Sequence, residues 1–226
     1  PAGRAAHTPS GGYLAVIRHR PTLLLCLLAL AGLFAPYLGV TLVSNYLHNE
    51  RGVSLGLIGA FGSLVAAGSI GAGLAVSRVA WLGRSMRGAL LTFGCLPGVF
   101  ALLLASRATV AIALAFLLWG IGSVSQQTFY SAISEASPAH LRIRAFALLE
   151  VSWSAGIMLA GFAAGALYGI DPALPLWLAL AGSLLLIGAT LVVRRAVLAW
   201  QANELAGAQV RTARRPDHGS TGAAIC

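Results

Sequence analysis

The sequence predicts an all-α membrane protein with six transmembrane helices, and three observations support this. First, 58% of the 226 residues are hydrophobic and only 9% are charged, whereas soluble domains carry roughly a quarter charged residues. Second, the chain contains successive uncharged windows that are long enough to cross a bilayer, which takes roughly 20 residues. Third, the basic residues lie in short stretches between these windows. The chain is therefore expected to fold in a bilayer.

The predicted spans follow one another along most of the chain. Pro21 suits the first turn of the first span, because its missing N–H costs nothing there, and Pro36 is expected to kink that helix. The second span is rich in glycine, which allows close approach to a partner helix, and we expect Gly71 and Gly73 to make that contact. The predicted spans are 21–47, 54–77, 88–106, 108–134, 144–169 and 173–193, within a domain over 18–195.

Polar sequence flanks this domain on both sides. Residues 1–17 form a polar arm without hydrophobic period, which suits the end of a central linker. Arg194 and Arg195 are expected to stop the sixth span, and residues 196–226 form a mobile basic tail with one helical segment near 197–209. The chain begins with Pro1, so we expect it to be a piece of a longer protein.

The positions of the arginines predict which side of the membrane each loop occupies. The net charge of +9 is carried by arginine without lysine. Six spans place Arg51 and Arg107 on one side and every other arginine on the opposite side. Arginine in short loops marks the cytoplasmic side, so both termini are expected in the cytoplasm and the protein in the cytoplasmic membrane. No basic stripe is interleaved with aromatic residues, so a nucleic-acid partner is disfavoured.

Two loops carry a resemblance to a known family. The second span ends in Gly73-Leu-Ala-Val-Ser77-Arg78, with Gly83, Arg84 and Arg87 after it, and this is similar to the loop motif of the major facilitator superfamily, with Ser77 in place of its aspartate. Glu135-Ala-Ser-Pro138, followed by Arg142 and Arg144, is similar to a second loop of that family. Six helices with both ends inside resemble one half of such a twelve-helix transporter, and the degenerate motif favours the C-terminal half over the N-terminal half.

The resemblance implies a secondary active transporter, a permease or an exporter, that moves a small molecule by alternating access. Its partners would be the missing half of the same chain or a second copy, besides membrane lipids, with protons as a candidate coupling ion. The residues to which it assigns gating or proton coupling are Gly73, Arg78, Gly83, Arg84, Arg87, Glu135, Arg142, Arg144 and Glu150.

Polar residues inside the spans are the candidates for substrate binding, because a polar group that faces lipid is costly. In the first span they recur at a spacing of four, and in the fourth at four, three and four, so each set shares one helical face. Their amide, hydroxyl and aromatic groups suit a neutral or amphipathic small molecule. Alternatively, serine and threonine bond back to their own helix and tyrosine lies at the membrane interface. The candidates are Tyr37, Thr41, Asn45, Trp119, Ser123, Gln126, Gln127 and Tyr130.

Glu150 is the one charged residue inside a predicted span, about two turns from the cytoplasmic end of the fifth helix. A carboxylate beside a water-filled path can carry a coupled proton. Alternatively, it forms an ion pair with Arg142, Arg144 or an arginine of the Arg78–Arg87 loop, and so locks the inward gate. Both interpretations remain open from the sequence.

Two other function classes compete with transport. An intramembrane enzyme needs a nucleophile with histidine, a carboxylate pair or histidine ligands within the spans, but each histidine lies in a loop, arm or tail. We therefore expect no catalytic residue, metal or cofactor. The second competitor is a membrane scaffold without transport activity, or a half-sized protein acting as a homodimer, since glycine-rich faces serve dimerisation equally well.

Overall fold

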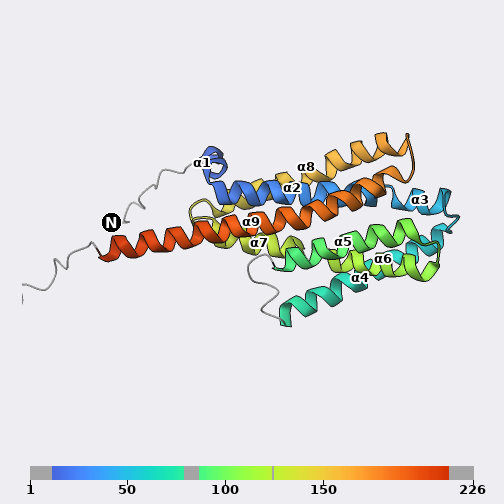
Figure 1. Ribbon diagram of the computed structural model, residues 1–226, viewed down its shortest axis with the longest axis horizontal. Coiled ribbons are helices and arrows are strands. Elements are labelled where there is room, and N and C mark those ends of the chain that lie inside the picture. Colours follow the sequence, from blue (N-terminus) through green and yellow to red (C-terminus); the bar gives the residue numbers. More distant parts are fainter. Residues whose placement is uncertain (1–11, 79–86, 124, 214–226) are drawn as a thin grey trace, which may run out of the picture.

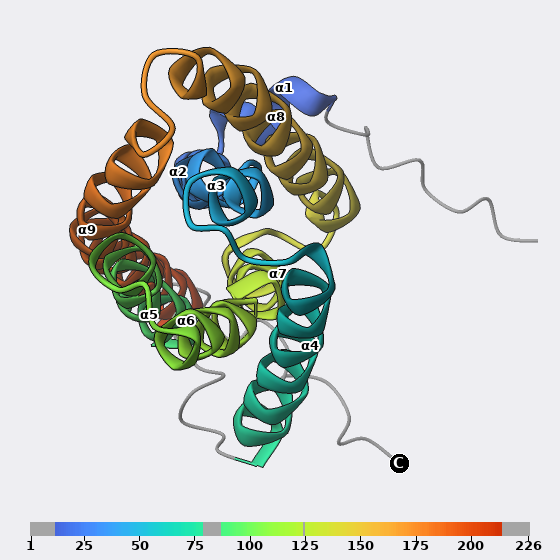
Figure 2. The same cartoon turned by 90° about the vertical axis from the view of Figure 1, so that its right-hand side faces the viewer.

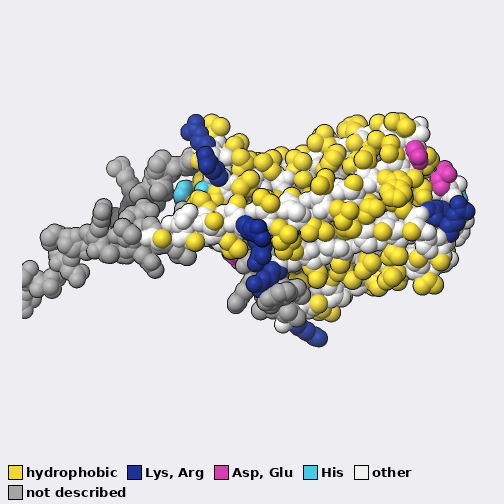
Figure 3. Space-filling view, viewed as in Figure 1, with side chains coloured by type: hydrophobic (Ala, Val, Ile, Leu, Met, Phe, Trp, Pro, Cys, Tyr) yellow, Lys and Arg dark blue, Asp and Glu magenta, His cyan; other side chains and the backbone are white. Residues whose placement is uncertain are grey.

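The structure, a computed structural model, describes residues 12–78, 87–123 and 125–213 (Figure 1). Within this part of the chain, six helices or helix pairs are long and apolar enough to cross a membrane, which confirms the predicted six helical segments. Hydrophobic side chains cover most of the length of the bundle, and charged side chains gather toward its two ends (Figure 3). The helices are α1 (Tyr13–Arg18), α2 (Arg20–Val40), α3 (Val43–Asn49), α4 (Leu55–Arg78), α5 (Arg87–Ala105), α6 (Thr109–Gly122), α7 (Ser125–Ala136), α8 (Arg142–Tyr168) and α9 (Leu174–Ala213).

The first predicted span consists of two helices, α2 and α3. Pro21 lies in the first turn of α2, as predicted. The helix continues through Pro36 to Val40, so the interruption comes later than the predicted kink. It falls at Thr41 and Leu42, where the hydroxyl of Thr41 donates to Tyr37 O at 2.6 Å and Leu42 leaves the helical region at φ −112° and ψ 12°. A hydroxyl that bonds back to its own helix commonly bends that helix.

The fourth predicted span is also interrupted. It consists of α6, which ends at Gly122, and α7, which begins at Ser125, and Ser123 forms a turn after α6. The hydroxyl of Ser123 donates to Gly120 O at 2.8 Å. The sequence turns polar here, with Ser123, Ser125, Gln126 and Gln127, but no proline or charged residue marks the end of a helix. Two of the six spans therefore contain breaks inside the bundle.

The structure corrects the predicted boundaries at both ends of the domain. Residues 13–17, which we assigned to a polar arm, form α1 together with Arg18, and Val16 within this helix is buried. Arg194 and Arg195 do not end a helix, since α9 runs for 40 residues to Ala213. Arginine is a good helix former, so a charge that ends a membrane span need not end the helix. The helical segment predicted at 197–209 is confirmed, but it is continuous with α9.

The six segments pack in a regular order. Viewed end-on, α2 and α3 lie between α8 and α9, while α6 lies between α4 and α5 (Figure 2). The third and sixth segments, α5 and α9, also pack against each other. If the first segment is exchanged with the fourth, the second with the fifth and the third with the sixth, these same pairs of segments are in contact. Because three crossings invert the direction of the chain, the pattern is that of an inverted repeat.

Glycine permits two close contacts between these segments. A Cβ atom on Gly120 would overlap the carbonyl oxygen of Val65, and one on Gly68 would overlap that of Leu117, so α4 and α6 touch backbone to backbone. A Cβ on Gly156 would lie 2.6 Å from Leu30 O, so α8 also approaches the backbone of α2, though less closely. The prediction that Gly71 and Gly73 make the close contact of the second span is wrong for the described residues, none of which lies within 4 Å of a Cβ at either position.

Arg51 joins the turn after α3 to the end of α5. Its guanidinium donates to Ser106 O at 3.1 Å, Leu104 O at 2.9 Å and Leu103 O at 3.2 Å, and also to the hydroxyl of Tyr46 at 2.8 Å. The last carbonyls of a helix have no partner within the helix and carry its negative dipole end. The charge of Arg51 is therefore satisfied by α5. The adjacent Gly52 has φ +67°, a value that favours glycine and lets the chain turn into α4.

Candidate functional site

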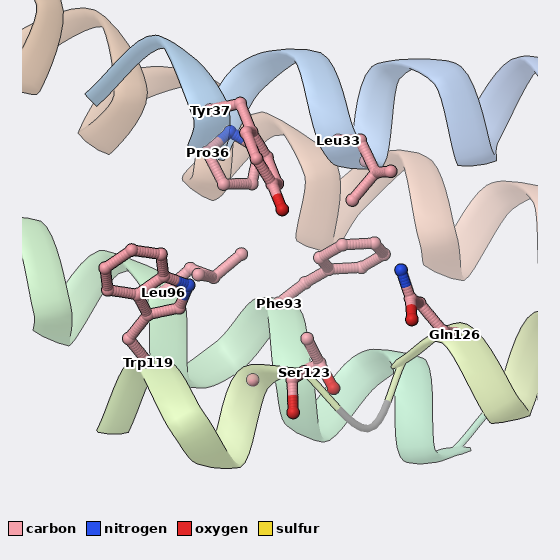
Figure 4. A pocket seen from close by; sticks show the side chains of 11 residues that line it. Leu33, Pro36, Tyr37, Phe93, Leu96, Trp119, Ser123 and Gln126 are labelled. Carbon is pink, nitrogen blue, oxygen red and sulfur yellow. The ribbon is translucent and has the colours of Figure 1, made fainter. Parts of the chain in front are cut away.

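A cavity of about 220 Å³ lies between the two interrupted segments. Its wall is formed by α2 on one side, by α6 and α7 on the other, and by α5 between them (Figure 4). No charged side chain lines it among the described residues. Such a wall suits an uncharged ligand, because aromatic and apolar groups alternate with a few hydrogen-bonding groups. The lining residues are Gly32, Leu33, Pro36, Tyr37, Thr92, Phe93, Leu96, Trp119, Gly122, Ser123 and Gln126.

On the α2 side, a small residue makes room for an aromatic ring. A Cβ on Gly32 would lie 2.8 Å from Cζ of Phe93, so only glycine lets this ring approach α2. In Figure 4 the ring of Phe93 lies between Tyr37, which extends from α2, and Gln126, which extends from α7. Phe93 itself is buried and contacts Phe129 edge-on, with ring centroids 6.4 Å apart. The ring therefore lies at the centre of the site.

On the opposite side, α6 and α7 contribute Trp119, Ser123 and Gln126. The hydroxyl of Ser123 donates to Gly120 O at 2.8 Å and accepts a hydrogen bond from the hydroxyl of Ser69 at 2.8 Å. The hydroxyl oxygen of Ser69 also lies 3.1 Å from Gly120 O. This network holds the break between α6 and α7 against α4, so a wall of the cavity is joined to a neighbouring segment.

The structure brings four of the predicted binding residues to the cavity, namely Tyr37, Trp119, Ser123 and Gln126. Thr41 and Asn45 do not line it, although they share a helical spacing with Tyr37. The hydroxyl of Thr41 donates to Tyr37 O, which is the alternative role that the sequence allowed. The spacing fails here because the helix is interrupted at Thr41 and Leu42, which changes the direction of the face.

Gln127 and Tyr130 also lie outside the cavity wall. Gln127 is exposed. The hydroxyl of Tyr130 donates to the carboxylate of Glu150. The ring of Tyr130 packs edge-on against Trp153 and Phe146, with centroids 5.2 and 5.7 Å away. The contacts of Tyr130 therefore place the exposed carboxylate of Glu150, on α8, beside α7.

Among the described residues, the carboxylate of Glu150 accepts a hydrogen bond from Tyr130. Nε of Arg142, one of the arginines considered as an ion-pair partner, is buried without a hydrogen-bond partner. Arg144 lies in the first turn of α8, next to the buried Ala145. A role for Glu150 as a proton carrier or as a gate anchor stays a prediction.

The remaining gating candidates that the structure describes lie at the end of the bundle where α4 ends and α5 and α8 begin. Gly73 and Arg78 belong to the last turns of α4, where Ser77 donates to Leu74 O at 2.8 Å. Arg87 begins α5. Glu135 accepts a hydrogen bond from Ser131 at 3.3 Å within α7. Gly83 and Arg84 lie outside the described residues.

Sequence reasoning missed the contribution of α5. Thr92, Phe93 and Leu96 line the cavity, but the third span contains no polar residues at helical spacing. One signal was available, because Thr92 is the one hydroxyl residue between Gly88 and Ala105. A lone hydroxyl in an apolar span is a candidate contact for a ligand or another helix.

The described residues contain no cluster of three or more histidine, cysteine, aspartate or glutamate side chains that could hold a metal ion. The chemistry that the site offers is thus hydrogen bonding and aromatic contact. No family model, curated protein or solved structure matches this chain.

Proposed function

We propose that this chain is a six-helix unit of a secondary active transporter of the major facilitator type. In this proposal it lies in the cytoplasmic membrane with both termini inside and moves a neutral or amphipathic small molecule by alternating access. The observation that carries the proposal is the cavity between α2, α5 and the interrupted pair α6 and α7. Interrupted helices in the middle of inverted repeats are a common way for transporters to build substrate sites.

The contact pattern supports the same proposal. Exchange of the first three segments for the last three leaves the packing order unchanged, as an inverted repeat requires. Two segments related by this exchange, α2 with α3 and α6 with α7, form opposite walls of the cavity. A small rotation of one repeat against the other would then alter access to a site that lies between them.

Transport can be tested with purified protein in proteoliposomes. The assay measures the flux of radiolabelled neutral amphipathic compounds, benzamide among them. Trp119→Ala and Gln126→Ala are expected to reduce the flux at least tenfold, because both remove cavity contacts. Leu185→Ala is the matched control, since Leu185 is 76% exposed on α9. Equal flux in all three variants, or no flux above that of empty vesicles in any compound, would contradict the proposal.

The proposed orientation has its own test. Single cysteines at positions 51 and 107, in a chain without Cys26, Cys95 and Cys226, are expected to react with an impermeant maleimide from outside the cell. Cysteines at positions 84 and 142 are expected to react only after the membrane is opened. Labelling of position 84 from outside would overturn the six-span topology.

Proton coupling through Glu150 can be separated from a gating role. If Glu150 carries the coupled proton, Glu150→Gln abolishes pH-driven accumulation and leaves substrate exchange intact, because glutamine keeps the shape but does not titrate. If Glu150 anchors a gate, the same change alters exchange itself. Full pH-driven transport by Glu150→Gln would refute both roles.

A second candidate function is a homodimeric or scaffolding membrane protein. The observation that favours it is the exposure of Gln127 and Glu150 within spans, since lipid would be a poor environment for both. A second copy or another half could cover them. Cross-linking of Gln127→Cys in the cysteine-free chain tests this, because a disulfide dimer without transport activity in the flux assay would favour the second candidate.

A further inference from the structure

Glu150 is an exposed carboxylate within a span, and three aromatic rings gather beside it. Phe146, Glu150 and Trp153 recur at intervals of four and three along α8, so they share one helical face. Tyr130 reaches this face from α7, which lies beside α8 (Figure 2). The ring centroids of Trp153 and Phe146 lie 5.2 and 5.7 Å from that of Tyr130. One negative charge is thus combined with three rings from two helices.

The carboxylate and part of the aromatic surface can be reached from outside the bundle. Glu150 is exposed and Tyr130 is 38% exposed, whereas Phe146 is half-buried. Trp153 is only 6% exposed and packs against the ring of Tyr130 from the buried side. A ligand can therefore contact the carboxylate together with the rings of Tyr130 and Phe146, while Trp153 holds Tyr130 in place.

The negative charge of Glu150 has no opposite charge beside it among the described residues. Tyr130 donates its hydroxyl to Oε1, and no other described residue forms a hydrogen bond or an ion pair with this carboxylate. Arg142 and Arg144 lie about 12 and 9 Å away along the axis of α8, at the rise of an α-helix. A hydroxyl donates a hydrogen bond but does not neutralise a charge, and an uncompensated charge in a span is costly. A cationic ligand would compensate it.

The groups around the carboxylate select the kind of cation. Metal ions prefer several oxygen or nitrogen ligands, whereas the described residues here offer one carboxylate and one hydroxyl and form no metal-ligating group. A carboxylate with aromatic rings instead suits an organic cation, above all a quaternary ammonium group. Glu150 lies about 12 Å along α8 from its first residue. An amphipathic ligand at this depth keeps its charge near the membrane interface and its apolar part in the hydrocarbon.

We propose that Glu150, Tyr130 and Phe146 form a binding site for an amphipathic organic cation. The carboxylate pairs with the positive charge, and the two rings contact the alkyl groups around it. This inference goes beyond the proposed function, because the site shares no residue with the uncharged cavity between α2, α5, α6 and α7 and does not require transport. A quaternary ammonium group belongs either to a free molecule or to the headgroup of a choline lipid, and the experiment separates these sources.

The test uses the full chain in a maltoside detergent without phospholipid. The probes are benzyltrimethylammonium and neopentylbenzene, its neutral isostere with carbon in place of nitrogen. Equilibrium dialysis against protein-free micelles measures binding, and thermal unfolding shows whether each variant is folded. Glu50→Gln is the matched control, since Glu50 is an exposed carboxylate at the end of α3.

The unaltered protein is expected to bind the cation about tenfold more tightly than the neutral isostere, because one charge pair distinguishes them. Glu150→Gln should remove this preference and leave the affinity for neopentylbenzene unchanged. Glu150→Asp, which keeps the charge, should retain part of the preference. Phe146→Leu should weaken cation binding about threefold, the effect of one lost contact between a cation and a ring. Glu50→Gln should bind as the unaltered protein does.

The source of the cation is identified by repeating the measurement in nanodiscs of phosphatidylethanolamine and of phosphatidylcholine. Equal affinity for benzyltrimethylammonium in the two lipids would assign the site to free cations. Weaker binding in phosphatidylcholine would show that its headgroup competes, so that a choline lipid occupies the site. Both results keep the site and differ only in its occupant.

Three outcomes would overturn the inference. The first is equal affinity of folded Glu150→Gln and Glu50→Gln for the cation, and the second is equal or absent binding of the two probes by the unaltered protein. The third is a loss of cation binding in Trp119→Ala but not in Phe146→Leu, which would place the cation in the cavity instead. Phe146→Leu retains the charge and tests the site independently if Glu150→Gln does not fold. Failure of the proposed function is a different result, measured by flux.

Discussion

The contact of α4 with α6 and the contact of α2 with α8 occupy equivalent places in the packing order but are built differently. Between α4 and α6, glycines on both helices meet, and the hydroxyls of Ser69 and Ser123 bond across the contact. Between α2 and α8, Gly156 meets the backbone at Leu30, and Ser152 bonds back to Leu148 O of its own helix and also pairs with the thiol of Cys26 on α2. The first contact is held by shape and by a bond between two hydroxyls, and the second by shape and by the weaker hydrogen bond of a thiol.

Two helix contacts that are equivalent in an inverted repeat can therefore differ in how firmly they hold their helices together. Ser123 lines the cavity and bonds to α4, so a ligand that moves this wall acts directly on α4. The corresponding link to α8 comes from α7, through Tyr130 and Glu150. We infer that α8 can move relative to α2 more readily than α4 can move relative to α6.

The largest expected effect comes from filling the glycine contacts. Gly120→Ala should destabilise the protein by about 3 kcal/mol, because the new methyl group meets backbone that cannot move aside. Gly156→Ala should cost less, about 1 to 2 kcal/mol, since its Cβ would lie 2.6 Å from Leu30 O, whereas a Cβ on Gly120 would lie 2.1 Å from Val65 O. Thermal unfolding in detergent measures both. Gly94→Ala is the control, as no described atom lies within 4 Å of the added Cβ, and a larger loss for Gly156 than for Gly120 would reverse the comparison.

A smaller effect is expected from the hydroxyls of the α4–α6 contact. Ser69→Ala and Ser123→Ala should each lower the free energy of unfolding by about 1 kcal/mol. The double variant should lose less than the sum, because the two hydroxyls share one bond. Ser77→Ala on α4 serves as the control and should have little effect, since Ser77 is exposed and its hydroxyl bonds back to Leu74 O of its own helix. Strictly additive losses would show that the hydroxyl network does not join the two helices.

The smallest effect is expected from Tyr130→Phe, which keeps the ring between Trp153 and Phe146 but removes its donor to Glu150. We expect a loss of about 0.5 kcal/mol, because both groups are exposed. Hydrogen exchange should nevertheless increase in α8 and not in α4, since the hydroxyl links α7 to α8 alone. Equal increases in both helices would remove the proposed difference between the two sides.

The sequence predicted the existence of the spans far better than their internal geometry. Uncharged windows locate six helical segments, because the exclusion of charge from a bilayer leaves a direct trace in composition. The break at Thr41 and Leu42 leaves no such trace, since both residues also occur within continuous helices. Arg194 and Arg195 mark a polar boundary, but the helix continues through them because its backbone bonds do not depend on the surrounding solvent.

The site was predictable only where polar side chains recur on one helix. Spacing identified Tyr37, Trp119, Ser123 and Gln126, since each lies on a face that turns toward the cavity. Thr92 was missed because it has no polar neighbour at helical spacing on α5. Phe93 was missed because its place at the centre depends on Gly32, which belongs to another helix. Contacts of that kind are set by tertiary packing.

The bonds of Arg51 to the end of α5 also bear on how the chain is assembled during synthesis. The carbonyls of Leu103, Leu104 and Ser106 become available only after the third segment has left the ribosome and entered the bilayer. Until then the guanidinium has only Tyr46 within its own hairpin. Arg51 can therefore join the first and third segments before α6 has left the ribosome, and a released chain that ends at Ala108 should already protect Arg51 from modification. The main packing partners of α2, α4 and α5 belong to the last three segments, so the first three segments complete their packing only when the last three are present.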